Sequence, residues 1–157
     1  MIGPPTEKAQ LAMTPEQRDT CRAIEREGKK INDEINALRT EEQTLRDERR
    51  LISDTIATNK REIAKLQRDR TTACLLGPRR RSERPMSLVG DGLGVLDCFA
   101  KLDRIQREID GLKSGMRVLE QELQRIDRRL ETIRRLIAGK MALFPILRRQ
   151  KESAGCP

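Results

Sequence analysis

The sequence contains no histidine, tryptophan or tyrosine and only two phenylalanines among its 157 residues. Without histidine, the chain lacks the commonest general base and the commonest metal ligand. Aromatic side chains supply much of the buried area of a compact core, so their scarcity argues against a thick globular core. The sequence also has no glycine-rich phosphate loop followed by lysine and no pattern that predicts a pocket with paired carboxylates. We therefore expect a protein that is not an enzyme and that uses no cofactor, metal ion or small molecule.

The four cysteines stand far apart in the sequence and form no CxxC pair, which argues against a zinc site. Isolated cysteines in a helical chain fit a reducing compartment, such as the cytosol or nucleus. Cys21 and Cys98 fall at apolar positions of the repeat described below, where we expect buried thiols. Cys74 and Cys98 would approach each other if the chain folded back, but we expect both to stay reduced. No segment has the apolar core of a signal peptide or the length of a membrane span, so we expect a soluble cytoplasmic protein.

The chain does have two long heptad repeats, in which apolar residues recur at alternating intervals of three and four. This pattern resembles coiled-coil proteins in general. In the first repeat the polar residues Glu42, Arg49 and Asn59 interrupt the apolar series. They either fix the register and partner number or are tolerated because long polar side chains can lie across the helix contact. The predicted helix-pairing residues are Ile31, Ile35, Leu38, Leu45, Ile52, Ile56, Ile63, Leu66, Leu102, Ile105, Ile109, Leu112, Met116, Leu119, Leu123, Ile126, Leu130, Ile133 and Ile137.

Capping and breaking signals divide the chain. Thr14, Pro15 and Gln17 form a strong helix start, with a capping residue, a proline at the first helical position and a capping-box partner. Gly77 and Gly139 are expected stop signals. The predicted segments are an extended arm over 1–13, a long helix over 14–76, an Arg-rich linker over 77–91, a second helix over 92–139, and an irregular docking segment and basic tail over 140–157.

The charges that flank the apolar positions favour one pairing of the two helices. Parallel self-pairing of the second helix would place Arg129 against Arg134. The first helix could pair in parallel without repulsion between flanking charges, although Glu42 and Arg49 would each face their own copy at the helix contact. If the chain folds back with Leu66 opposite Leu102, most flanking contacts are attractive. We therefore predict an all-α fold, in which two long helices form an antiparallel coiled-coil hairpin. The attractive contacts are Glu41–Arg129, Arg39–Asp127 and Arg46–Glu120, and the repulsive one is Glu48–Glu122.

The formal net charge is +8, with the basic excess in the linker and the C-terminal half. Such a surface attracts an acidic partner, for example tubulin, nucleic acid or anionic lipid. Ser82 follows three arginines and is either a phosphorylation site for a basic-directed kinase or part of a solvated loop. The residues expected to contact an acidic partner are Arg79, Arg80, Arg81, Arg84, Arg148 and Arg149.

These patterns favour a structural function. We expect a coiled-coil scaffold subunit that docks on or bridges other proteins through protein–protein interactions in a large assembly. A cytoskeletal assembly is our first choice, in particular a microtubule-based one such as the axoneme of a cilium or flagellum. One alternative is a nuclear coiled-coil factor that makes non-specific contacts with nucleic acid through its Arg-rich loop. The other is an adaptor whose helices complete a helical bundle with a partner chain.

Overall fold

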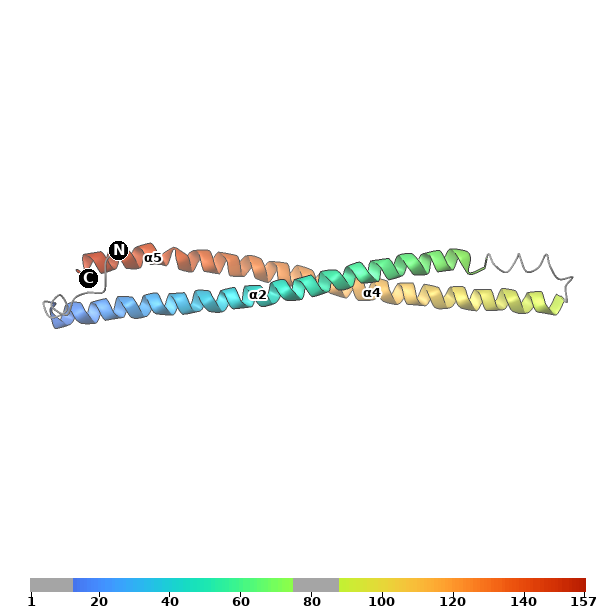
Figure 1. Cartoon of the computed structure of the whole chain (residues 1–157), viewed down its shortest axis with the longest axis horizontal. Coiled ribbons are helices and arrows are strands. Elements are labelled where there is room, and N and C mark those ends of the chain that lie inside the picture. Colours follow the sequence, from blue (N-terminus) through green and yellow to red (C-terminus); the bar gives the residue numbers. More distant parts are fainter. Residues whose placement is uncertain (1–12, 75–87) are drawn as a thin grey trace. The chain divides into compact units, whose positions relative to one another are not determined.

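The computed structural model describes residues 13–74 and 88–157, which form helices and short connecting turns and no strand. Two long helices, α2 (Pro15–Thr72) and α4 (Leu88–Met141), pack against each other, and a short helix, α5 (Leu143–Ser153), follows α4 (Figure 1). The predicted all-α class with two long helices is thus confirmed. Within the described ranges, no helix carries an apolar stretch sufficient to cross a membrane.

The start of α2 is the capping box that the sequence predicts. The backbone N–H of Gln17 donates to Thr14 Oγ1 at 3.1 Å, and the N–H of Thr14 donates to Gln17 Oε1 at 3.0 Å. These two bonds satisfy backbone donors that the first helical turn leaves without intrahelical partners. Pro15 occupies the first helical position, where a missing N–H costs nothing.

The end of α2 comes earlier than expected, at Thr72. The hydroxyls of Thr71 and Thr72 both donate to the carbonyl of Arg68, at 2.7 and 3.1 Å. Side-chain bonds of this kind compete with the backbone ladder, and threonine is a weak helix former. Leu76, the predicted end, lies outside the described residues, as do Gly77, Arg79, Arg80, Arg81, Ser82 and Arg84.

The bounds of α4 differ from the prediction at both ends. The helix begins at Leu88, inside the predicted linker, and continues through Gly139 to Met141. Glycine only lowers helix propensity, by about 1 kcal/mol relative to alanine, and it leaves the hydrogen-bond ladder intact. The break comes instead from Pro145, because a proline removes the bond to the carbonyl four residues earlier, here that of Met141, and its ring crowds that carbonyl.

The predicted irregular C-terminal tail is wrong, because residues 143–153 form α5. Pro145 is tolerated in the first turn of this helix, where its missing N–H has no intrahelical partner. The helix stop is Gly155, with a φ of 71°. The N–H of Gly155 donates to the carbonyl of Glu152 at 3.1 Å, and that of Cys156 donates to Lys151 at 3.0 Å. This is the Schellman arrangement, which requires a left-handed residue and so favours glycine.

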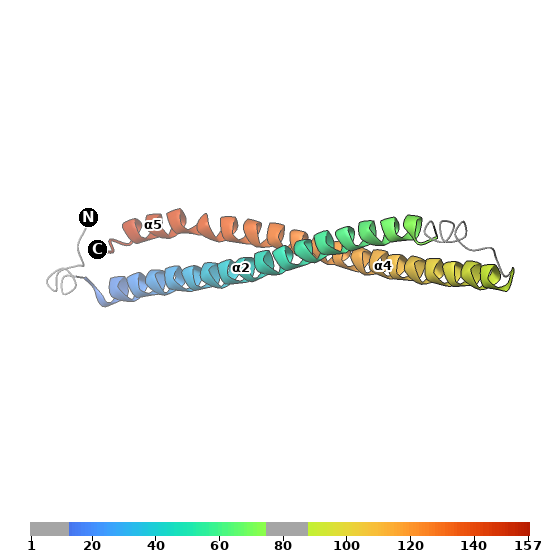
Figure 2. The same ribbon diagram turned by 45° about the vertical axis from the view of Figure 1, so that its right-hand side comes forward.

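Contacts divide the chain into two units. Unit 1 comprises the residues up to Asp47 together with Asp127–Pro157, and unit 2 comprises Glu48–Ile126. In unit 1 the beginning of α2 lies beside the end of α4 and α5, and in unit 2 the end of α2 lies beside the earlier part of α4 (Figures 1 and 2). Each unit has its own buried apolar residues.

Candidate helix-pairing interface

The apolar centre of unit 2 is a cluster contributed by both long helices. Ile63 and Leu66 of α2 are each 7% exposed, and they cluster with Ile105 and Ile109 of α4, which are 8% and 1% exposed. Their intervals of three and four residues place each pair on one helix face. The partly buried residues that pack against this cluster are Ala73, Leu112 and Met116.

All nineteen predicted pairing residues are buried or half-buried in the structure. The polar residues of the first repeat differ, since Glu42 and Asn59 are half-buried and Arg49 is exposed. An exposed Arg49 fits the interpretation that long charged side chains are tolerated at such positions. The buried members are Ile31, Ile35, Leu45, Ile56, Ile63, Leu66, Ile105, Ile109, Ile126 and Ile133, and the half-buried members are Leu38, Ile52, Leu102, Leu112, Met116, Leu119, Leu123, Leu130 and Ile137.

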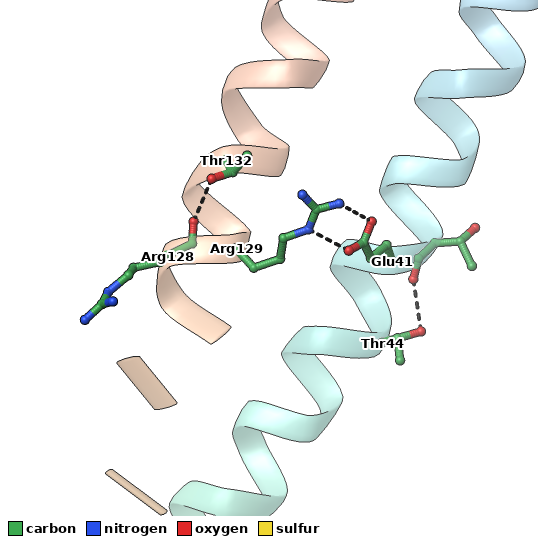
Figure 3. A network of polar contacts seen from close by, with 6 residues as sticks. Glu41, Thr44, Arg128, Arg129 and Thr132 are labelled. Carbon is green, nitrogen blue, oxygen red and sulfur yellow. Dashed lines mark hydrogen bonds and ion pairs between the residues drawn. The ribbon is translucent and has the colours of Figure 1, made fainter. Parts of the chain in front are cut away.

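An ion pair between the helices of unit 1 confirms the predicted contact between Glu41 and Arg129. Arg129 Nε donates to Glu41 Oε1 at 2.7 Å and Nη2 donates to Oε2 at 2.9 Å (Figure 3). The planar guanidinium matches both carboxylate oxygens, which fixes the distance and orientation of the two side chains. The hydrogen bonds from Arg129 hold the pKa of Glu41 below 4.5, and in turn raise the pKa of Arg129. The neighbouring Arg128 points away from α2 (Figure 3).

A second ion pair joins the same two helices closer to α5. Lys140 donates to Glu34, and this bond is the main reason why the pKa of Glu34 lies below its usual value of 4.5. Glu34 and Glu41 are seven residues apart, so they lie on the same flank of α2. Unit 1 therefore has two polar pairs on one flank of its apolar contact.

In unit 2 an arginine interacts with both of the acidic residues, Glu48 and Glu122, that we predicted to repel each other. Arg125 Nε donates to Glu122 at 3.0 Å. This bond lowers the pKa of Glu122, and it is the largest cause of the raised pKa of Arg125, to which Glu48 also contributes through its charge. The attraction of Arg125 to both carboxylates offsets the expected repulsion between Glu48 and Glu122. Arg125 does not occupy a heptad position that flanks the helix contact, so the heptad pattern gave no sign of this attraction.

The four cysteines form two disulfides, Cys21–Cys156 and Cys74–Cys98, so the expectation of reduced thiols is wrong. In each pair the Cα atoms are 5.7 Å apart, which is an ordinary separation for a disulfide. Cys21 is buried as expected, but it is bonded to a residue 135 positions away. The pairing removes the argument for a reducing compartment. The approach of Cys74 to Cys98 follows from the predicted fold-back of the chain, whereas nothing in the sequence relates Cys21 to Cys156.

The C-terminal basic residues lie on an exposed part of unit 1. Arg148 and Arg149 are both exposed on α5. Arg149 also lines an open groove between α2 and α5, whose apolar residues include Ile24 and Ile146. Several large apolar side chains of this unit are 41–48% exposed, namely Leu136, Met141, Leu143 and Ile146. The groove was not predicted from the sequence, because residues 140–157 showed no heptad pattern.

The described residues contain no cluster of three or more histidine, cysteine or acidic residues that could hold a metal ion. Comparison of the chain with protein-family models, with curated proteins and with solved structures finds no match.

Proposed function

We propose that the chain is an antiparallel coiled-coil hairpin and acts as a non-enzymatic structural subunit that docks on or bridges other proteins in a large assembly. The observation that carries this proposal is that all nineteen predicted apolar pairing residues of the two long helices are buried or half-buried, with Ile109, Ile126 and Ile133 the least exposed. Apolar positions spaced in this way form a lateral contact surface for helices.

The antiparallel arrangement is supported by the sequence order of the contacts inside each unit. In unit 1, Glu34 pairs with Lys140, and the later residue Glu41 pairs with the earlier residue Arg129. In unit 2, Cys74 is bonded to Cys98, whereas the earlier Ile63 and Leu66 cluster with Ile105 and Ile109. Sedimentation and small-angle scattering of the oxidised chain test this arrangement. A monomeric rod of hairpin length is expected, and a parallel dimer of about twice that length would refute it.

For the partner, we propose an acidic protein surface in the cytoskeleton, in particular tubulin in an axoneme. The net charge of +8 and the exposed Arg148 and Arg149 support this choice, because complementary charge steers association. The disulfides do not favour it, since such bonds are rare in reducing compartments. The cytoskeletal proposal therefore rests on charge and on the elongated helices.

Co-sedimentation with microtubules tests this partner. We expect binding that weakens at the higher of two salt concentrations and survives a DNA competitor. Replacing Arg148 and Arg149 by glutamate should abolish most of it. The matched control replaces Lys29 and Lys30, which are also exposed in unit 1, by glutamate. The proposed contact would be contradicted if both variants lost microtubule binding equally, or if the DNA competitor displaced the protein from microtubules.

The adaptor alternative has its own support in unit 1. The groove between α2 and α5 and the exposed apolar residues of α4 and α5 are features that a further helix could cover. Recovery of one stoichiometric helical partner from native cells at high salt would favour this function over binding to tubulin. Retention at high salt is expected because apolar contacts are not screened.

A further inference from the structure

We propose that the Cys21–Cys156 disulfide is a redox-controlled latch that holds α5 against the first turns of α2. In this device the oxidised chain keeps α5 docked, and reduction of the bond releases α5 while the contact between α2 and α4 stays intact. The inference is independent of the partner, because it concerns contacts within unit 1 alone.

The non-covalent packing of α5 is looser than that of the two long helices. None of its residues is buried, and Leu143 and Ile146 are 41% and 47% exposed. Leu147 lies beside Gly28 of α2, where a Cβ would meet its Cδ1 at 3.8 Å. By contrast, Ile133 of α4 is fully buried. An isolated helix of 11 residues is only marginally stable in water, so α5 depends on its docking to remain helical.

The backbone at the end of α5 brings Cys156 to α2. The left-handed Gly155 turns the chain, and the N–H of Cys156 bonds back to the carbonyl of Lys151. Gly155 lies next to the side chain of Gln17, and Cys156 is bonded to Cys21 one turn further along α2. The disulfide therefore joins the two helices just beyond the last turn of α5, where it prevents α5 from moving away.

Cys156 is the more exposed of the two bonded residues. Cys21 is 7% exposed, whereas Cys156 is half-buried. The thiolate of a dithiol reductant can attack the Cys156 sulfur, so that the sulfur of Cys21 leaves as a thiolate. The second thiol of the reductant then attacks the mixed disulfide. The products are two cysteine thiols in the protein and one cyclic disulfide, with two electrons transferred from the dithiol.

The joint between α4 and α5 confines the motion to α5. Helix α4 ends at Met141 and α5 begins at Leu143, because Pro145 removes the hydrogen bond that would make them one helix. Only Ala142 lies between them, and its N–H bonds to Ala138. Release of α5 therefore does not require the turns of α4 around Ile133 to open.

Hydrogen exchange of the full-length protein tests the latch. The wild type is compared oxidised and after dithiothreitol, and C21S/C156S is compared with the matched control C74S/C98S, both oxidised. The amides of residues 147–153, whose N–H groups can bond within α5, should exchange roughly 30-fold faster in the reduced wild type and in C21S/C156S. This factor corresponds to the lower end of the usual contribution of a disulfide. Amides around Ile133 should keep their protection, and C74S/C98S should resemble the oxidised wild type.

Three results would overturn the latch. Equal amide exchange of residues 147–153 in oxidised wild type and C21S/C156S would show that packing alone holds α5. A loss of protection that also includes the amides around Ile133 would mean that the bond stabilises the whole unit. Free thiols at Cys21 and Cys156 under oxidising conditions, detected by mass spectrometry after alkylation, would show that the bond is absent. If C74S/C98S fails to fold, the comparison between wild type and C21S/C156S still decides.

Discussion

Replacing Ile109 by alanine tests whether the apolar contact between the long helices stabilises the protein. Ile109 is 1% exposed and clusters with Ile63, Leu66 and Ile105. The change removes three carbon atoms, which at about 0.8 kcal/mol for each buried methylene gives about 2.4 kcal/mol. The cavity that remains adds to this loss, and substitutions of this type usually cost 2–5 kcal/mol. A layer of two helices can partly collapse around the gap. We therefore expect I109A to lower the free energy of unfolding by about 2–3.5 kcal/mol.

The assay is urea unfolding of the oxidised protein, followed by circular dichroism at 222 nm. A graded series strengthens the test, since I109V removes one carbon and should cost about 0.5–1.5 kcal/mol. The control on the same helix is V118A, because Val118 is 64% exposed and its truncation should stay within about 0.5 kcal/mol. If I109A costs no more than V118A, the buried heptad positions do not hold the helices together, and the reasoning fails.

The remaining predictions concern glycines and ion pairs. G115A should raise the free energy of unfolding by about 0.5–1 kcal/mol, because an added Cβ would meet nothing within 4 Å and alanine is the better helix former. G155A should lower the free energy of unfolding by about 1–2 kcal/mol, since the φ of 71° at Gly155 disfavours a side chain. Urea unfolding measures the effect of both substitutions, and a change in the same direction for both would contradict this reasoning. R129K should raise the pKa of Glu41 towards 4.5, because lysine cannot donate two parallel hydrogen bonds to the carboxylate. A titration followed by NMR measures this pKa, and an unchanged value would contradict the role of Arg129. For Glu34 and Glu41 the folded pKa is depressed, so their stabilisation is present above about pH 4.5 and is lost as the pH falls through the lowered values. As the pH is lowered from 6, the free energy of unfolding should therefore fall less for E34Q/E41Q than for the wild type. If it falls equally in the two proteins, the two ion pairs make no such contribution.

The sequence by itself determined the features that depend on local chemistry and periodicity. The capping box at Thr14 and Gln17 needs only residues three apart, so the start of α2 was predictable. The heptad spacing placed the pairing residues on one face of each helix, because that placement follows from helix geometry alone. The contact between Glu41 and Arg129 was also predictable, since it follows from the choice of register.

The tertiary structure alone decided the contacts between residues far apart in the sequence and the exact ends of the helices. No local pattern relates Cys21 to Cys156, because their approach requires the packing of unit 1 and the turn at Gly155. Gly139 did not end α4 as expected, since a glycine destabilises a helix only modestly. Pro145 separates α4 from α5 and is itself tolerated in the first turn of α5. The hydrogen bond from Arg125 to Glu122 likewise depends on side-chain conformations, which heptad positions do not specify.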